Sequence, residues 1–438
     1  MSHRPTRRRV LQATAAGACA FFSWPLRAED KKPSPNERLH VGVIGVAAQG
    51  EYDWREVAGA GAEIVAWCDV DENRTGTARG AFPKATFDVD FRALLDRKGI
   101  DAVIVATPDH THAVATVAAL KSGRHVYCEK PLTHDVYEAR VVAETAAKEK
   151  RVTQMGTQIH AENNYRRVVE IVQAGILGDV RRVHVWCQKR PTPGFRAKKD
   201  NPPPVGLNYD LWLGPAPARA FNANRFHYNW HWFWDYGNGD IGNQGIHQVD
   251  MARWGLGVKY PTKISAIGGH FMFDDDQETP NDLSASFEFN DGGVKKMMTF
   301  EVRHWITNHE AGVTETDAGT VGAIFYGSKG YLTVWSEDFG KYTSFLGREQ
   351  TPGPSGSDLG NHFGNFIDGL RSRKHADLNG PIEEGAISTT LVHLANISYR
   401  LGRTLHFDAA SYSCVGDAEA NRMFRRTYRK PFVVPEKV

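Results

Sequence analysis

Two glycines and one acid have the types and spacing needed to bind a dinucleotide. The segment Gly45-Val46-Ala47-Ala48-Gln49-Gly50 follows an apolar run and opens a helix, and Asp69 ends the next apolar run. Such a turn binds pyrophosphate through backbone N–H groups at the positive end of the helix. The acid accepts hydrogen bonds from ribose hydroxyls and repels a 2′-phosphate, so the pattern predicts NAD rather than NADP. Ala47 stands at the second glycine position, where its methyl group is a mild obstruction.

Polar residues also follow two later apolar runs. Residues 102–106 precede Thr-Pro-Asp-His-Thr-His, and residues 125–128 precede Glu-Lys-Pro. Ligands of parallel sheets bind at the carboxyl ends of the strands. We therefore expect the following residues near the cofactor: Thr107, Pro108, His112, Glu129 and Lys130.

Aromatic residues are concentrated in residues 226–236, where seven of eleven are aromatic and two are histidines. Aromatic rings stack on the C–H faces of sugars, so the stretch predicts a wall of a carbohydrate site, with plain core packing as the alternative. The spacing of His227 and His231 could hold a metal ion, but no third ligand follows at a suitable distance, so we expect no metal.

Two or three domains are expected to position these residues, because the chain has 438 residues. Hydrophobic residues make up 41% and charged residues 24%, which is typical of a globular protein. The net charge of +2 is not that of a nucleic-acid-binding protein, and no apolar run is long enough to span a membrane. Five cysteines without paired spacing favour neither a disulfide scaffold nor a zinc site.

The order of apolar runs predicts two kinds of sheet. Strands and helices alternate over residues 39–158, which predicts a parallel, Rossmann-type α/β domain. Residues 159–430 contain strands with alternating polarity at 180–189, 263–272, 283–290 and 293–303, which predict an open, mostly antiparallel sheet with helices, an α+β domain. We expect the helix at 380–402 to pack back on the first domain.

The first 28 residues are typical of an export signal. An arginine cluster at residues 7–9 precedes a short apolar stretch and then Leu-Arg-Ala, a small-residue cleavage site. The paired arginines resemble a twin-arginine signal, which carries folded proteins to the periplasm or beyond. Residues 29–38 are a polar, proline-bearing linker.

Together these motifs resemble the Gfo/Idh/MocA oxidoreductases, the group of glucose-fructose oxidoreductase and inositol dehydrogenase. Besides the glycine turn, Asp69 and Glu129-Lys130-Pro131, the matching features are Gly239-Asp240-Ile241-Gly242-Asn243-Gln244-Gly245-Ile246-His247-Gln248-Val249-Asp250, Tyr326-Gly327-Ser328-Lys329-Gly330 and residues 365–370. The resemblance covers about residues 39–430, and the leader favours the exported branch.

The resemblance implies roles for individual residues. Lys130 would lie at the nicotinamide and the reacting carbon, and Glu129 would contact the nicotinamide ribose, often beside a cis bond before Pro131. His247 would act as general base or hydrogen-bond the reacting hydroxyl. An acid commonly stands four residues before this histidine, but here the position is Asn243. His247 then works alone, or Asp240 or Asp235 replaces the lost carboxylate.

The complete expected site follows from these motifs and the resemblance. Lys130, His247 and Asn243 are the expected catalytic residues. The expected cofactor contacts are Gly45, Ala47, Ala48, Gln49, Gly50, Asp69, Thr107, Pro108, His112, Glu129, Lys130 and Gln158. The expected substrate contacts are Arg166, His231, Trp232, Trp234, Asp240 and His247, and Asp250 is expected to be structural. A homo-oligomer through the C-terminal sheet is also implied.

Three functions remain open. The first is an NAD-dependent oxidoreductase that moves hydride at a ring carbon of a sugar, polyol or glycoside, with a tightly held cofactor. The second is an NAD-dependent glycosidase or lyase, which oxidises the sugar transiently, eliminates a group and reduces the product again. Export favours such a self-contained cycle, because a released cofactor would be lost outside the cytoplasm. The third is a non-catalytic sugar-binding protein on the same fold.

Overall fold

The computed structural model describes residues 38–187, 200–271, 273, 275–304, 321–335 and 341–436. The expected signal, 1–28, and all of the linker except Arg38 lie outside these residues, so both stay predictions. Residues 39–438 form one unit.

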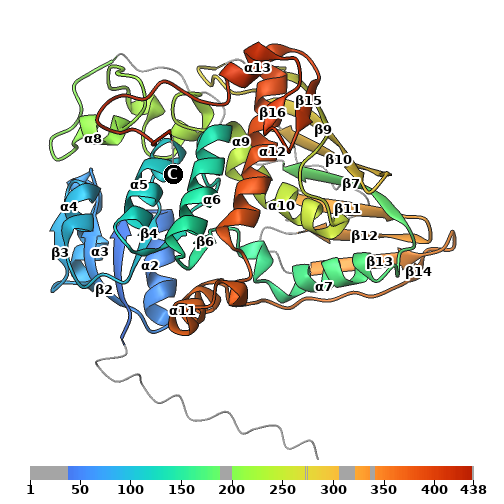
Figure 1. Ribbon diagram of the computed structural model, residues 1–438, viewed down its shortest axis with the longest axis horizontal. Helices are drawn as coiled ribbons and strands as arrows, with labels where there is room; N and C mark the ends of the chain where they lie inside the picture. Colours follow the sequence, from blue (N-terminus) through green and yellow to red (C-terminus); the bar gives the residue numbers. More distant parts are fainter. Residues whose placement is uncertain are drawn as a thin grey trace, which may run out of the picture. The chain divides into compact units, whose positions relative to one another are not determined.

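A six-stranded parallel sheet forms the N-terminal part of this unit (Figure 1), as the alternating pattern predicts. Its order is β3-β2-β1-β4-β5-β6. The strands are β1 (His40–Ile44), β2 (Glu63–Cys68), β3 (Thr86–Asp88), β4 (Ala102–Val105), β5 (His125–Cys128) and β6 (Thr153–Met155). Every residue of β4 is fully buried, because helices cover both faces of the sheet. The strand order reverses between β1 and β4, which is where such sheets bind ligands.

Helices connect these strands and pack on the two faces. They are α2 (Gln49–Gly59), α3 (Gly76–Ala81), α4 (Phe91–Asp96), α5 (Asp109–Lys121) and α6 (Val136–Glu149). One apolar core contains side chains of α5 and α6, and another contains side chains of α2. The second core also takes Phe363 and Phe366 from α11 (His362–Ser372), so a helix far along the chain completes the first domain.

A ten-stranded sheet forms the second layer, in the order β14-β13-β12-β11-β7-β10-β9-β8-β15-β16. Neighbouring strands are antiparallel except β7 and β10, so the expectation of a mostly antiparallel sheet is confirmed. The predicted strand ends Lys189 and Met272 lie outside the described residues. The strands are β7 (Val180–Cys187), β8 (Lys263–Gly269), β9 (Asp282–Asp291), β10 (Val294–Arg303), β11 (Val321–Gly327), β12 (Gly330–Trp335), β13 (Lys341–Leu346), β14 (Thr351–Pro352), β15 (Leu405–Asp408) and β16 (Ser413–Cys414).

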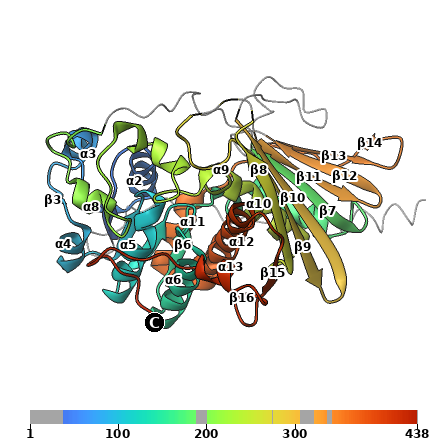
Figure 2. The same ribbon diagram turned by 90° about the horizontal axis from the view of Figure 1, so that it is seen from above.

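Two long helices lie between the sheets (Figure 2). They are α10 (Gly245–Leu256) and α12 (Ile382–Leu401), and α12 touches both α6 and β8. Both helices are buried around most of their circumference, which is typical of a helix with a neighbour on every side. The remaining α-helices are α7 (Asn163–Gln173), α8 (Tyr209–Leu213), α9 (Gly239–Asn243) and α13 (Ala418–Arg422).

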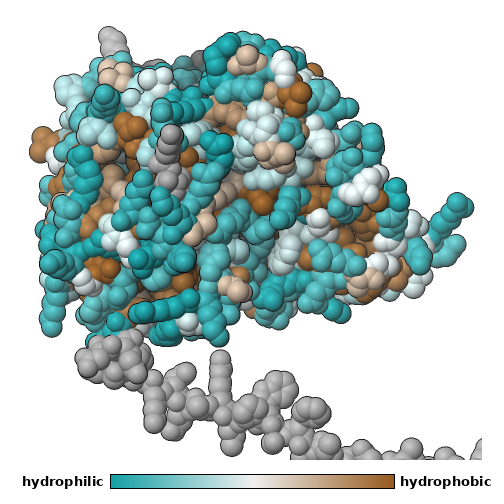
Figure 3. Space-filling model, in the orientation of Figure 1, coloured by the Kyte–Doolittle hydropathy of each residue, from teal (hydrophilic) through white to brown (hydrophobic). Residues whose placement is uncertain are grey.

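The face of the molecule in Figure 3 is mostly hydrophilic, with hydrophobic side chains scattered among polar ones. Among the helices of the described residues, none is both long enough and apolar enough to cross a bilayer.

Candidate functional site

A cavity of about 920 Å³ opens at the carboxyl ends of the parallel strands. Its lining joins the glycine turn and the end of β2 to the end of β5, the start of α10 and residues 211–231. The expected residues that line it are Gly45, Ala47, Ala48, Gln49, Asp69, Thr107, Pro108, Glu129, Lys130, Gln158, His231, Asn243 and His247. The fold therefore brings most of the predicted cofactor residues and all three predicted catalytic residues to one cavity.

The glycine turn has the close contacts that its motif requires. Gly45 has φ +87°, and a Cβ there would lie 2.4 Å from the carbonyl oxygen of Ala106. A Cβ on Gly50 would lie 2.0 Å from the carbonyl oxygen of Gly45, so Gly50 packs inside the turn rather than on the cavity wall. Ala48 has φ 53° and ψ −115°, a conformation that normally requires glycine.

Asp69 lies where the ribose acid is expected, at the end of β2. One carboxylate oxygen accepts a hydrogen bond from the Val46 amide at 3.0 Å, and the other accepts from the Asp71 amide at 3.0 Å. Burial raises the pKa of Asp69, and these two amide donors oppose that shift. A carboxylate has about four acceptor positions, so two remain for ribose hydroxyls. The residues thus fit an adenosine ribose without a 2′-phosphate.

Lys130 lies at the cavity wall after β5. Its ammonium nitrogen donates a hydrogen bond to the backbone oxygen of Asn243 at 2.9 Å. The Lys130–Pro131 peptide bond is cis. Behind the wall, the two ring nitrogens of His112 lie 2.8 Å from the Pro131 oxygen and 2.7 Å from the Thr107 oxygen. His112 does not line the cavity; it ties the loop after β4 to the loop after β5.

A second carboxylate, that of Asp53, lies near Glu129, and Gln49 contacts both. The Gln49 amide donates to Asp53 at 2.9 Å and to Glu129 at 3.5 Å, and the Tyr127 hydroxyl lies 3.3 Å from Glu129. Burial raises the pKa of both carboxyls, and the charge of Lys130 partly opposes the shift at Glu129. Asp53 is fully buried on α2, and the helical pattern gave no sign of it.

Asn243 and His247 enter the cavity from the second domain. His247 is buried at the start of α10, and Asn243 ends α9. The Asn243 amide donates to Asp240 at 2.9 Å and lies 3.4 Å from the Tyr228 hydroxyl. Asp235 instead pairs with an arginine, Arg219, at 3.1 Å. Of the two candidates for the missing carboxylate, Asp240 is therefore the one in contact with Asn243.

Four predicted substrate contacts do not line the cavity. Arg166 is exposed on α7 and donates to the Asn379 side chain at 2.7 Å. The guanidinium of Arg400 covers the ring of Trp234 at 5.0 Å. Trp232 is buried in the protein, and Asp240 lies behind Asn243. Asp250, expected to be structural, is fully buried 2.6 Å from His160.

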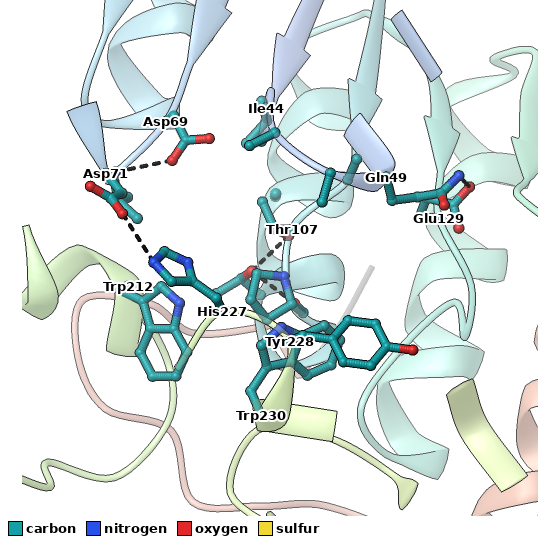
Figure 4. A pocket seen from close by; sticks show the side chains of 18 of the residues that line it. Ile44, Gln49, Asp69, Asp71, Thr107, Glu129, Trp212, His227, Tyr228 and Trp230 are labelled. Carbon is teal, nitrogen blue, oxygen red and sulfur yellow. Dashed lines mark hydrogen bonds and ion pairs between the residues drawn. The ribbon is translucent and has the colours of Figure 1, made fainter. Parts of the chain in front are cut away.

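The aromatic stretch supplies the wall opposite the sheet (Figure 4). Phe226, His227, Tyr228, Trp230 and His231 line the cavity, and the last two rings stack with centroids 3.6 Å apart. These residues belong to a segment that we call the cover, residues 200–236.

The cover is fastened to the first domain next to Asp69. The amide of Asn208 donates to the Val70 oxygen at 2.8 Å, and Asp71 forms a β-bridge with Leu207. His227 adds a side-chain link, with its Nε2 atom 3.4 Å from the Asp71 carboxylate and its Nδ1 atom 2.9 Å from the Arg74 guanidinium. Figure 4 shows the His227 ring reaching Asp71 from the opposite wall.

His227 is neutral in this link. Burial and the charge of Arg74 lower the pKa of His227 to about 4, although Asp71 opposes the shift. The neutral ring therefore accepts from Arg74 at Nδ1, and its Nε2 atom, which carries the hydrogen, faces the Asp71 carboxylate. The sequence marked His227 as part of an aromatic stretch and as a possible metal ligand with His231, and nothing local pairs it with Asp71 or Arg74, which are more than 150 positions away.

Comparison with known proteins agrees with this architecture. Residues 39–157 match the NAD-binding Rossmann fold of the Gfo/Idh/MocA oxidoreductase family, and residues 162–276 and 351–434 match that family's C-terminal alpha/beta domain. The chain belongs to the Gfo/Idh/MocA oxidoreductase family. The predicted cofactor, NAD, agrees with this assignment.

Named relatives are similar over about a third of the chain. Inositol 2-dehydrogenase 1 of Saccharopolyspora erythraea is 36% identical over 150 residues, 33% of this chain and 44% of that protein. Inositol 2-dehydrogenase of Salmonella typhimurium is 30% identical over 150 residues, 33% of this chain and 45% of that protein. The chain thus spans less than half the length of these relatives.

Solved structures share the fold along most of the chain. Aldose-aldose oxidoreductase from Caulobacter crescentus, complexed with glycerol, has a TM-score of 0.63 at 16% identity and covers 84% of this chain and 100% of its own. Levoglucosan dehydrogenase in complex with NADH has a TM-score of 0.61 at 14% identity and covers 84% of this chain and 99% of its own. At these identities the likeness establishes the fold.

Proposed function

We propose that this protein is an NAD-dependent oxidoreductase acting on a ring carbon of a sugar, polyol or glycoside. The observation that carries the proposal is the meeting of Lys130, Asn243 and His247 in one cavity with the glycine turn and Asp69. NAD, when bound, supplies the hydride acceptor. The named relatives are inositol dehydrogenases, which favours a polyol or a sugar.

Residues of the protein supply charge stabilisation, proton transfer and stacking surfaces for the substrate. The Lys130 ammonium, held by the Asn243 backbone, is placed to bind the substrate oxygen and to stabilise negative charge that develops on it. His247 is the group suited to take the hydroxyl proton, because imidazole is the side chain that most often transfers protons near neutral pH. The aromatic rings of Tyr228 and Trp230 offer stacking faces for the sugar ring.

We further propose that NAD is retained between turnovers. The cover lies along the cavity and is fastened beside the adenosine end through Asn208 and His227, so release requires these contacts to break. Retention favours the alternative function, a glycosidase or lyase that oxidises, eliminates and reduces on one bound cofactor. A non-catalytic sugar-binding protein is the least favoured, because Lys130 and His247 both reach the cavity.

The first experiment is to denature the purified protein and identify the released nucleotide by mass spectrometry. About one NAD(H) per chain supports retention, and assays with myo-inositol, glucose and an aryl glycoside without added cofactor then separate net oxidation from cleavage. An empty protein with weak NAD affinity contradicts retention. Absence of turnover on every probe, with NAD bound, contradicts the proposed enzyme.

Export by the twin-arginine route is a separate proposal, supported by the arginine cluster and apolar stretch of the first 28 residues. Fractionation of a cell that expresses the full chain tests it: the shortened protein is expected in the periplasm, and substitution of Arg7 and Arg8 by lysine is expected to keep it inside. The homo-oligomer expected through the C-terminal sheet is also a proposal, tested by light scattering of the purified protein.

A further inference from the structure

A buried acid–histidine pair, Asp240 and His304, lies behind Asn243, which lines the cavity. The Asp240 carboxylate on α9 is 2.7 Å from Nε2 of His304, which follows β10, and neither side chain is exposed to solvent. The two residues come from separate elements, 64 positions apart. A carboxylate removed from water needs a partner of this kind, because an unpaired buried charge is costly.

The other oxygen of Asp240 orients the amide of Asn243. Their contact, 2.9 Å from the amide nitrogen to the carboxylate oxygen, joins residues three positions apart on α9. An ionised carboxylate can only accept hydrogen bonds, so it selects the NH₂ side of the amide. The carbonyl side of Asn243 is thereby turned away from Asp240, and Asn243 lines the cavity.

The same short helix holds the reactive lysine. The backbone oxygen of Asn243 accepts the hydrogen bond from Lys130, so the position of the ammonium depends on the position of α9. This helix has only five residues and contains Gly239 and Gly242. So short and glycine-rich a helix has little stiffness of its own, and its contact with His304, just after the end of β10, supplies an external anchor.

We infer that Asp240 and His304 are positioning residues, which hold Asn243 and, through it, the ammonium of Lys130 at the reacting end of the cavity. Neither residue lines the cavity, so they act through Asn243 and Lys130 rather than by touching substrate. The inference deepens the proposed function and rests on it for the kinetic part of the test. In this interpretation, Asp240 provides the carboxylate that the family commonly has at the position of Asn243.

The NH₂ orientation of Asn243 requires a group at position 240 that can only accept hydrogen bonds. Asn243→Asp alone places two carboxylates at hydrogen-bonding distance, where they cannot both stay ionised, so one takes up a proton or moves away. Asp240→Asn alone places two amides there, which can pair in either orientation, so the variant no longer selects the NH₂ side of Asn243 and also removes the acid partner of His304. The double variant Asp240→Asn/Asn243→Asp again pairs one amide with one carboxylate, in reversed order. Recovery in the double variant is a result that a purely structural role for Asp240 does not predict.

The kinetic test measures single-turnover reduction of bound NAD at 340 nm, using as probe whichever of myo-inositol, glucose or aryl glycoside the unchanged protein oxidises. Asp240→Asn and His304→Gln are each expected to slow reduction about 100-fold, with KM changed less than about threefold. The double variant is expected to recover at least tenfold over either of its single variants. His184→Gln is the matched control, because His184 on β7 contacts Thr299 on β10, and normal kinetics are expected.

A second measurement needs no turnover. Acetic anhydride labelling of Lys130, quantified by peptide mass spectrometry, reports how firmly the Asn243 backbone holds the ammonium. His304→Gln and Asp240→Asn are expected to speed labelling of Lys130 at least threefold, with exposed Lys98 as the internal reference. His304→Gln leaves the buried carboxylate of Asp240 without its partner, so this variant can fail to fold. In that case the double variant Asp240→Asn/His304→Gln, which removes the buried charge, is used instead.

The possible outcomes distinguish failure of the positioning role from failure of the proposed function. Wild-type rates and labelling in Asp240→Asn and His304→Gln overturn the inference, and so does a lower melting temperature with normal turnover per folded molecule. If the unchanged protein oxidises no probe, the proposed function fails, and the labelling of Lys130 decides the positioning role by itself.

Discussion

The ammonium of Lys130 lies 2.9 Å from the backbone oxygen of Asn243, which joins the end of β5 in the first domain to the end of α9 in the second. This hydrogen bond crosses the cavity wall between residues 113 positions apart. The ammonium proposed to bind the substrate oxygen is therefore placed by both domains, and neither domain alone contains the complete proposed site.

Removal of the lysine tests its role directly. Lys130→Ala is expected to reduce turnover by roughly 10²–10³-fold or more while bound NAD stays near one per chain, because the lost ammonium stabilises developing charge rather than the nucleotide. Turnover and released nucleotide are measured on the same sample. Lys121→Ala, at the exposed end of α5, is the control. Undiminished activity in Lys130→Ala contradicts the mechanism.

The link between His227 and Asp71 is expected to slow cofactor release. His227→Gly removes the ring and suits the positive φ of 58° at this position. Loss of the hydrogen bond from Arg74 and of the contact with the Asp71 carboxylate is expected to speed NAD release about tenfold, equivalent to about 1.4 kcal/mol. The release rate is measured by chasing bound NAD with an excess of labelled NAD. Gln350→Gly, also at a positive φ but away from the cavity, is expected to release NAD at the normal rate.

The strained turn residue gives a stability prediction. Ala48→Gly is expected to raise the free energy of unfolding by about 1 kcal/mol, because glycine adopts φ 53°, ψ −115° without a Cβ clash. Ala58→Gly, inside α2, is expected to lower it by about 0.5–1 kcal/mol. Urea unfolding at equilibrium measures both changes. A loss of stability in Ala48→Gly would mean that the turn does not carry this strain.

Asp109 at the start of α5 predicts a pH dependence. Burial raises the pKa of Asp109 to about 8, although its hydrogen bond from Asn238 and the charge of Lys130 oppose the shift. Because the folded state holds this proton more tightly than the unfolded chain, the contribution to stability is complete below about pH 4. It is lost as the pH rises through 8.

Asp109→Asn removes this titration. The variant is expected to gain roughly 1–3 kcal/mol in unfolding free energy relative to the unchanged protein between pH 5 and pH 9. Melting temperatures at the two pH values measure the change. A constant difference between the two proteins over this range would show that Asp109 does not titrate there.

The local sequence pattern was sufficient to predict the fold of the first domain. Short apolar runs, a glycine turn and Asp69 follow one another within one βαβ unit, and the carboxyl-end rule places Lys130 and Glu129 without knowledge of distant segments. His247 and Asn243 were instead reached through the resemblance to the family. The local pattern also predicted that Gly50 and His112 contact the cofactor, although both pack inside the wall and do not line the cavity.

The sequence by itself determined the Rossmann domain, the cofactor and the residue types at the reacting end, because those signals are local and periodic. Only the tertiary structure decided that Asp240 rather than Asp235 supports Asn243, that His304 supports Asp240, and that the exposed Arg166 lies away from the cavity. Periodicity records which face of an element is buried, but not which distant partner buries it. Contacts such as Asp240–His304 depend on how α9 meets β10, which the packing of the whole domain fixes.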